Sequence, residues 1–417
     1  MREGNGKKGG LFLLWSVLGP GLLGALADND AGGIISYAVT GAKFGYGIFL
    51  PVTLCLVIVT YTVQEMAMRL GVVAGKGYNE LVRQRYGKFW MMYQVISLFI
   101  ENLITLVTEF IGMSAGLVMI GIPMWGAVLI GLGLVLSIAL YRGYAKKERI
   151  AIIIGLLNVV FIVVAFLVRP SMQDIGNAFL FWGVPQGQGR NVLWYLIALV
   201  GNAIAPWMIF YQNSAYLEKG TAAKELRHGR LDTVIGCVCQ VLIAVCIIVI
   251  GASLSSQGTD IEQAGPAQIV QALGEQFGFP AALLFGLGLF NAGILAAITV
   301  SLSSSWSVAQ AFGWSKSLNE SIRQAPKFYG IYFASVLIAA GVVLIPGLPL
   351  NHLAVLAQVL GGILMTPILI FLTLLTSNKE IMGEYRNRGF GKVRAWVVVG
   401  LLAVISTSAA LLSLLPI

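Results

Sequence analysis

The stretch GALADNDAGG, residues 24–33, decides the fold. It interrupts an apolar segment with glycine, aspartate and asparagine, which all form helices poorly. A second apolar segment is interrupted by GNAIAPW, residues 201–207. There Pro206 lacks an N–H and would clash with the carbonyl of Asn202 in a continuous helix. Two broken segments at corresponding places in two halves of a chain are typical of inverted-repeat membrane proteins with a binding site at the midplane.

The composition around these breaks is that of a membrane protein. Hydrophobic residues make up 58% of the 417 positions, charged residues 11%, and the mean hydropathy is +0.85. A soluble domain with so little charge could not keep its surface hydrated. Apolar runs long enough to cross a bilayer predict an all-α protein with about eleven transmembrane helices. Their ranges are 10–40 (broken), 46–68, 89–118, 124–141, 149–168, 191–216 (broken), 231–252, 280–308, 328–346, 352–376 and 395–416.

Short connections between these spans leave no room for a second domain, so residues 1–417 are expected to form one transmembrane domain. The first repeat would comprise spans 1–5 (10–168) and the second spans 6–10 (191–376). Span 11 (395–416) would be a peripheral addition. This is a 5+5 inverted repeat in which helices 1 and 6 are broken.

Basic residues support this number of spans. All of the 27 Lys and Arg residues fall on one side of the predicted membrane except Lys43, Arg169 and Arg190. The positive-inside rule makes that side cytoplasmic, which predicts a cytoplasmic N-terminus and an extracytoplasmic C-terminus in the cell (inner) membrane. The net charge of +9 then reflects membrane topology rather than nucleic-acid binding.

Four carboxylates lie at membrane depth without a basic residue in the same span: Asp28, Asp30, Glu101 and Glu109. Intramembrane acids usually mark an ion path or a buried pair. An unwound turn also frees backbone carbonyls, which together with a carboxylate form a site for a hard cation. We therefore predict that Asp30 binds the cation, and that Asp28 lines the path or caps the next half-helix. Alternatively, both acids only satisfy backbone N–H groups of the unwound turn.

A fifth acid, Glu65, lies near the inner end of span 2, four residues before Arg69. We expect these two to form an ion pair on the helix surface, outside the site.

These motifs resemble the NRAMP family of divalent-metal transporters. The similarity includes Gly19-Pro20-Gly21 and extends through Gly41 to Tyr46, with looser matches in spans 2, 3 and 8. The family's Asp-Pro-Gly-Asn motif falls on residues 30–33, and its Met-Pro-His motif falls on residues 205–207. The resemblance implies a LeuT-like fold that works by alternating access.

The resemblance also implies a metal site. It carries the metal-binding aspartate onto Asp30 and two carbonyl ligands onto Ala27 and Asn202. The family's asparagine and methionine ligands become Gly33 and Ala205. Because a thioether favours Mn²⁺ and Fe²⁺, losing it is expected to leave a wider, harder site that suits Mg²⁺. The pattern is similar to the NRAMP-related magnesium transporters.

Gln358, in span 10, is either a further polar group near the ion or an interhelical hydrogen-bond donor.

Proton coupling is expected to be absent. In the family's proton path the aspartate becomes Leu106, the glutamate stays as Glu109, and the motif histidine becomes Trp207. The two histidines of the chain, His228 and His352, are predicted near span ends, so no group that titrates at neutral pH stands by the site. Facilitated uptake of Mg²⁺, with some Mn²⁺, is therefore the predicted function.

Three alternatives stay open. A proton-coupled Mn²⁺/Fe²⁺ symporter would share the fold and Asp30. A sodium-coupled symporter of organic solutes would also share the fold, although two aspartates would repel a carboxylate substrate. An intramembrane enzyme is disfavoured, because the sequence has no His-Glu-x-x-His or Gly-x-Ser-x-Gly motif. No cofactor is expected; the predicted partners are the metal ion and the lipid bilayer, with the oligomeric state left open.

Overall fold

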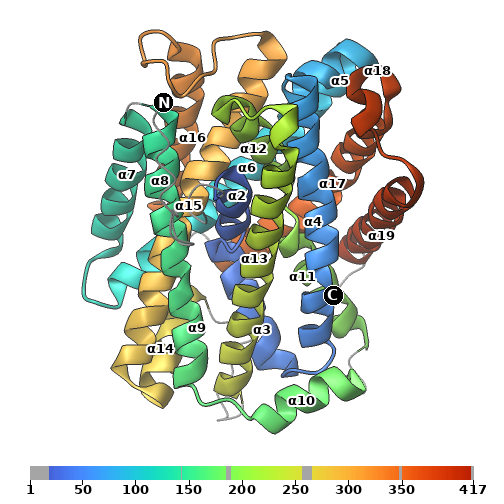
Figure 1. Ribbon diagram of the computed structural model, residues 1–417. Helices are drawn as coiled ribbons and strands as arrows, with labels where there is room; N and C mark the ends of the chain where they lie inside the picture. Colours follow the sequence, from blue (N-terminus) through green and yellow to red (C-terminus); the bar gives the residue numbers. More distant parts are fainter. Residues whose placement is uncertain (1–17, 142, 185–188, 256–264, 347–349, 415–417) are drawn as a thin grey trace, which may run out of the picture.

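We describe the fold from a computed structural model that covers residues 18–141, 143–184, 189–255, 265–346 and 350–414 (Figure 1). Within these ranges the regular structure is entirely helical. The eleven predicted spans correspond, in chain order, to α2 (Pro20–Ala27) with α3 (Ala31–Phe44), α4 (Phe49–Ala74), α6 (Lys88–Val118), α7 (Met124–Leu140), α8 (Tyr144–Leu156) with α9 (Val160–Leu167), α11 (Gly189–Ala203) with α12 (Pro206–Lys219), α13 (Leu226–Ser255), α15 (Phe279–Phe312), α16 (Pro326–Val343), α17 (Leu350–Ser377) and α19 (Gly389–Leu414).

Length and composition confirm most of the predicted spans. In the described ranges, nine helices are long and apolar enough to cross a membrane. The two remaining spans are α7, which has 17 residues, and the first span, which is split into two short helices. Residues 10–17, predicted to begin span 1, lie outside the described residues.

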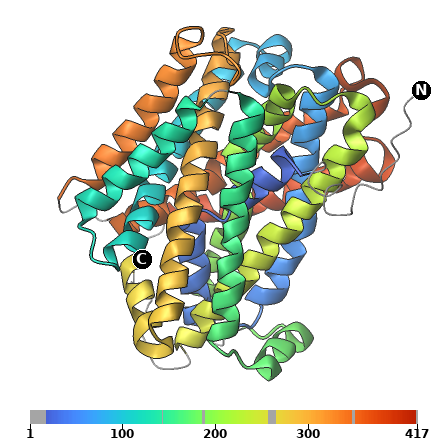
Figure 2. The ribbon, with the colours of Figure 1, turned by 60° about the vertical axis from the view of Figure 1, so that its left-hand side comes forward.

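Short helices at the ends of the bundle were not predicted, because they are too short to show a hydrophobic period. They are α5 (Tyr78–Tyr86), α10 (Met172–Phe181), α14 (Pro266–Phe277) and α18 (Lys379–Met382). Figures 1 and 2 show α10 and α14 at one end of the bundle and α5 at the other.

Ion pairs join the basic connections at the α5 end. Arg85 of α5 bonds Glu380 of α18 at 2.9 Å. Lys316, which follows α15, lies 3.8 Å from Glu80 of α5. Connections that are far apart in sequence therefore meet at one face, as the predicted alternation of loops requires.

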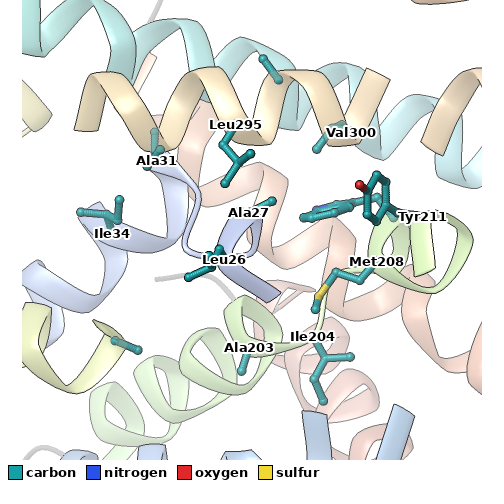
Figure 3. Close-up of a cluster of buried hydrophobic side chains, with 14 of the residues drawn as sticks. Leu26, Ala27, Ala31, Ile34, Ala203, Ile204, Met208, Tyr211, Leu295 and Val300 are labelled. Carbon is teal, nitrogen blue, oxygen red and sulfur yellow. The ribbon is translucent and has the colours of Figure 1, made fainter. Parts of the chain in front are cut away.

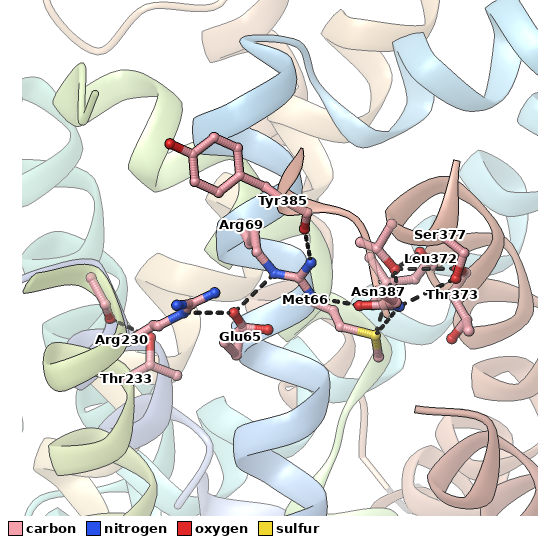
Figure 4. A network of polar contacts seen from close by, with 12 residues as sticks. Glu65, Met66, Arg69, Arg230, Thr233, Leu372, Thr373, Ser377, Tyr385 and Asn387 are labelled. Carbon is pink, nitrogen blue, oxygen red and sulfur yellow. Dashed lines mark hydrogen bonds and ion pairs between the residues drawn. The ribbon is translucent and has the colours of Figure 1, made fainter. Parts of the chain in front are cut away.

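An ion network at this face joins α4, α13 and the segment that follows α18 (Figure 4). Glu65 of α4 accepts hydrogen bonds from Arg69 at 2.9 Å and from Arg230 of α13 at 3.0 Å. Arg69 also donates to Asn387, after α18, at 2.6 Å. The predicted pair of Glu65 and Arg69 is confirmed, and Arg230 extends it to a second span.

Glycines let the broken first span sit deep in the bundle. A Cβ added at Gly41 of α3 would lie 2.0 Å from the carbonyl oxygen of Ile248 of α13. One added at Gly251 would lie 1.9 Å from the carbonyl oxygen of Ala38. The two backbones are thus in direct contact, as small residues allow between membrane helices. Consequently α2 and α3 lie inside the bundle, whereas α19 packs on α17 at its edge (Figure 1).

Candidate metal site

The first break separates α2 from α3. Helix α2 ends at Ala27, and α3 begins after Asp30, whose backbone is extended (φ −75°, ψ 169°). Asp30 is 4% exposed, and its Oδ1 accepts a hydrogen bond from the backbone N–H of Gly33 at 2.6 Å. Asp30, and not Asp28, is therefore the N-cap of α3, which corrects the alternative prediction that Asp28 caps this half-helix.

Capping uses only part of the Asp30 carboxylate. Among the described residues, no donor forms a hydrogen bond with its second oxygen, Oδ2. A Cβ added at Gly33 would lie 3.0 Å from Oδ1 and 3.6 Å from the carbonyl oxygen of Asp28. Position 33, where the family pattern has asparagine, thus directly adjoins the carboxylate predicted to bind the cation.

The second break separates α11 from α12. Helix α11 ends at Ala203, and α12 begins at Pro206, so no backbone N–H from that residue reaches the carbonyl of Asn202. The backbone N–H of Ala205 donates to the sulfur of Met208 at 3.4 Å. Figure 3 shows the residues that flank both breaks close together, with the Met208 side chain pointing toward Ile204.

Gln240 of α13 connects the two breaks. Its Nε2 donates to the Asp28 carboxylate and, at 3.1 Å, to the carbonyl oxygen of Ala203. Its backbone carbonyl accepts a hydrogen bond from Asn29 at 3.1 Å. Asp28 is 2% exposed and its Oδ1 has no hydrogen-bond partner. Asp28 is therefore joined to the end of α11 through Gln240.

Ala27 and Asn202 also lie at the breaks, as predicted: Ala27 is the last residue of α2, and Asn202 precedes the end of α11. Both side-chain polar atoms of Asn202 are buried without a hydrogen-bond partner. Gln358 belongs to α17, but its side chain lies outside the described residues, so its role stays a prediction.

Glu109 of α6 contacts the start of α3. Its Oε2 accepts a hydrogen bond from the Ala31 N–H at 3.0 Å, and its Oε1 lies 3.3 Å from the hydroxyl of Thr108. Leu106 is fully buried. Trp207 is fully buried, stacks edge-on against Tyr211, and leaves its Nε1 without a hydrogen-bond partner. Trp207 thus fills core volume, as expected for a residue that replaces the family's histidine.

The ligand chemistry available here is that of a sparse oxygen site. The described residues contain no group of three or more His, Cys, Asp or Glu side chains that could hold a metal ion. The arrangement instead offers two incompletely bonded carboxylates, Asp28 and Asp30, beside the unwound backbone of the first break. Such a site can bind a cation that keeps several of its waters.

Two residues at the breaks were not predicted. Gln240 lies in the middle of a span, where an isolated amide is a signal for interhelical bonding that could have been followed. Met208 gave no signal, because a methionine in an apolar helix is usually core.

A family profile matches almost the whole chain. The family described as natural resistance-associated macrophage protein-like matches residues 21–412. The divalent metal cation transporter MntH of Aeromonas hydrophila is 26% identical over 416 residues, which cover 93% of this chain and 94% of the relative. MntH of Deinococcus radiodurans is 23% identical over 401 residues, which cover 91% of this chain and 86% of the relative.

Solved structures confirm the predicted LeuT-like helical fold. A manganese transporter of Eremococcus coleocola, in complex with an aromatic bis-isothiourea substituted compound, has a TM-score of 0.76 at 19% identity. The match covers 99% of this chain and 89% of that one. MhsT in complex with L-phenylalanine has a TM-score of 0.63 at 15% identity and covers 94% and 98%. Identities this low establish similarity of fold only.

Proposed function

The chain belongs to the family of natural resistance-associated macrophage protein-like transporters, and we propose that the divalent metal ion it carries is Mg²⁺, with some Mn²⁺. Its curated relatives are named as divalent metal cation transporters, so the chain is a transporter and not an enzyme. The observation that carries the choice of Mg²⁺ is the replacement of two family ligands by Gly33 and Ala205.

In this proposal Asp30 is the charged ligand, and the backbone carbonyls of Ala27 and Asn202 add neutral oxygens. Gln358 is proposed to contribute an amide oxygen from α17. Without side-chain donors at positions 33 and 205, the ion keeps more of its waters, which favours Mg²⁺ because it dehydrates reluctantly. The amide and thioether of the family pattern would instead favour Mn²⁺ or Fe²⁺.

The thioether of Met208 lies near the second break, but its hydrogen bond with the Ala205 N–H argues against a role as an ion ligand. Its sulfur lies 3.4 Å from the Ala205 N–H and accepts that hydrogen bond. The side chain is 1% exposed and belongs to the core around α12. We therefore propose that Met208 closes the first turn of α12 rather than binding the ion.

Restoring the family ligands tests this selectivity argument. The double variant Gly33→Asn, Ala205→Met should increase Mn²⁺ uptake relative to Mg²⁺ by about tenfold, because it adds an amide oxygen beside Asp30 and a soft sulfur donor. Uptake of both ions into proteoliposomes would be compared with the parent protein. Met208→Ala is the matched control and should leave the ion preference unchanged. An unaltered preference in the double variant would refute the argument from ligand softness.

Transport is proposed to be facilitated diffusion. Moving two positive charges inward gains about 4.6 kcal/mol per 100 mV of membrane potential, so no coupled proton is needed. Thr108 supports this view, since its Oγ1 lies 2.7 Å from the carbonyl oxygen of Thr105 and 3.3 Å from Oε1 of Glu109, and we assign its single hydrogen to the shorter contact. Its contact with Glu109 is then best made by a protonated Glu109, which acts as a hydrogen-bond donor rather than a proton relay.

We accordingly expect Mg²⁺ uptake without internal acidification. Vesicles that contain the protein and an internal pH dye should load Mg²⁺ at constant internal pH. Glu109→Gln should keep roughly wild-type uptake, because its amide can accept from the Ala31 N–H and donate to Thr108. Acidification at a fixed ratio to the metal, abolished in Glu109→Gln, would instead support the proton-coupled Mn²⁺/Fe²⁺ symporter.

The sodium-coupled solute symporter remains the less favoured alternative. The similarity to MhsT, solved with L-phenylalanine, shows only that this architecture can hold an organic molecule. Asp28 and Asp30 both lie at the first helix break, and two acids there would repel the carboxylate of such a substrate.

Alternating access is proposed to involve the repeats 10–168 and 191–376, with 395–416 peripheral. The N-terminus is proposed to be cytoplasmic and the C-terminus extracytoplasmic. The clustering of basic connections at the α5 end supports this orientation.

A further inference from the structure

Glu101 is a deeply buried carboxylate that the proposed transport mechanism does not yet use. It lies in α6 and is 2% exposed. Its Oε1 accepts a hydrogen bond from the hydroxyl of Thr105 at 3.2 Å, whereas its Oε2 is buried with no hydrogen-bond partner. A carboxylate oxygen without a donor at this depth is costly, so it requires an explanation.

The carboxylate lies beside the second helix break. A Cβ added at Gly361 of α17 would be 3.5 Å from Glu101 Oε1 and 3.7 Å from Cδ of Pro206. The carboxylate of Glu101 and the first residue of α12, Pro206, therefore both lie next to Gly361. Asp28 is joined through Gln240 to Ala203 at the same break, so Glu101 and the acids of the first break approach the second break from two sides.

Glu101 and Glu109 are placed differently with respect to this region. Eight residues separate them, which is about 12 Å along a helix axis. Glu109 bonds the start of α3. Glu101 lies nearer than Glu109 to the first residue of α6, which is the end that follows α5. In the proposed topology, Glu101 is on the cytoplasmic side of Asp30.

No basic side chain neutralises Glu101. Within the described ranges, the ion pairs involve Glu65, Glu80, Glu148 and Glu380, and none involves Glu101. Polar atoms without hydrogen-bond partners also occur on the two sides of the second break, on Asn202 and on the Trp207 indole. A hydrated cation would supply the missing positive charge, and one of its waters would donate a hydrogen bond to Oε2 of Glu101.

We propose that Glu101 is a second carboxylate of the cation site, which binds a water of the hydrated divalent ion on the cytoplasmic side of Asp30. This inference rests on the proposed function, because it takes the cargo to be a hydrated divalent cation. One carboxylate then binds the ion directly and the other binds its water, an arrangement suited to Mg²⁺. The specificity that Gly33 and Ala205 no longer provide would come in part from Glu101.

Glu101→Gln tests the proposal, because it keeps the size of the side chain and the contact with Thr105 but removes the charge. The Mg²⁺ concentration for half-maximal uptake should rise at least about tenfold, since the variant loses a negative charge that attracts the ion. The thermal stabilisation of the purified protein by Mg²⁺ should shrink in parallel. Glu275→Gln, an exposed carboxylate of α14, is the control for charge removal and should behave like the wild type.

The outcomes separate this inference from the proposed function. If wild-type protein takes up Mg²⁺ and Glu101→Gln matches it in both uptake and thermal stabilisation, Glu101 is only a structural group and the inference is wrong. If wild-type protein takes up no Mg²⁺, the proposed function itself fails. Should Glu101→Gln fold poorly, Glu101→Asp serves instead, because it keeps the charge and should retain Mg²⁺-dependent stabilisation.

Discussion

Replacing Asp30 should abolish divalent uptake while leaving the protein folded. Asp30→Ala removes the charged ligand and also the N-cap of α3, so it should cost about 1 kcal/mol of stability besides all transport. Asp30→Asn separates these effects, because asparagine caps a helix as well as aspartate does but carries no charge. Its uptake should equal that of empty vesicles, at a melting temperature near that of the wild type.

Radiotracer or dye-based Mg²⁺ uptake in proteoliposomes, with a thermal melt of the same preparations, would measure both effects. Asp28→Asn is the companion variant, and it should slow uptake without abolishing it. Asp28 accepts a hydrogen bond from Gln240, and in the proposed site it contributes negative potential near the ion. Transport near the wild-type rate in Asp30→Asn would refute the whole site assignment.

The sequence predicted the architecture well, because the bilayer imposes strong rules on length, charge and helix breaks. Residues 24–33 and 201–207 break their spans in the structure, and the described spans occupy the predicted parts of the chain. The helices at the bundle ends were missed, since amphipathic segments of 4 to 12 residues carry no comparable signal.

The site was predicted less completely, because side-chain contacts depend on how distant segments pack. The spacing around Asp30 marked the first break, but the bridge from Gln240 depends on α13 packing against α3. The two roles considered for Asp30 also turned out not to exclude each other: Oδ1 caps α3, and Oδ2 forms no hydrogen bond with a described residue. No sequence pattern indicates that one oxygen of a carboxylate caps a helix while the other forms no hydrogen bond.

Asp232, at one end of the bundle, shows that sequence alone does not reveal such contacts. In the sequence it is simply an acid at the start of a span, next to Arg230. In the structure it is 1% exposed and receives backbone N–H groups from Gly19, Gly21 and Leu22 at 2.8 to 3.1 Å. The hydroxyl of Tyr216 donates to it as well, at 2.8 Å. One carboxylate of α13 therefore holds the first turn of α2.

In the proposed topology this contact lies at the cytoplasmic end, and we propose that it holds that side of the site closed. All eight residues of α2 are buried. At the same end, Lys219 forms an ion pair with Glu148 of α8 at 3.3 Å. The α2 half-helix must move if the ion is to leave between these elements, and a charged acceptor of three backbone N–H groups opposes that movement.

Asp232→Ala should consequently shift the protein toward a conformation open at this end. Each hydrogen bond to a charged group contributes about 1.5–3 kcal/mol, so losing even one shifts the equilibrium between the closed and open conformations by at least about tenfold.

The test is a Leu23→Cys reporter in a background without the four native cysteines, since Leu23 lines a small cavity with Tyr144 and Tyr211. In Asp232→Ala the reporter cysteine should react at least tenfold faster with a water-soluble thiol reagent. Mg²⁺ uptake should fall, because a carrier that stays open on one side cannot complete the transport cycle. Asp232→Glu, which keeps the charge, should be much closer to the wild type in both measurements. Equal reaction rates in Asp232→Ala and the parent would show that Asp232 does not hold this end closed.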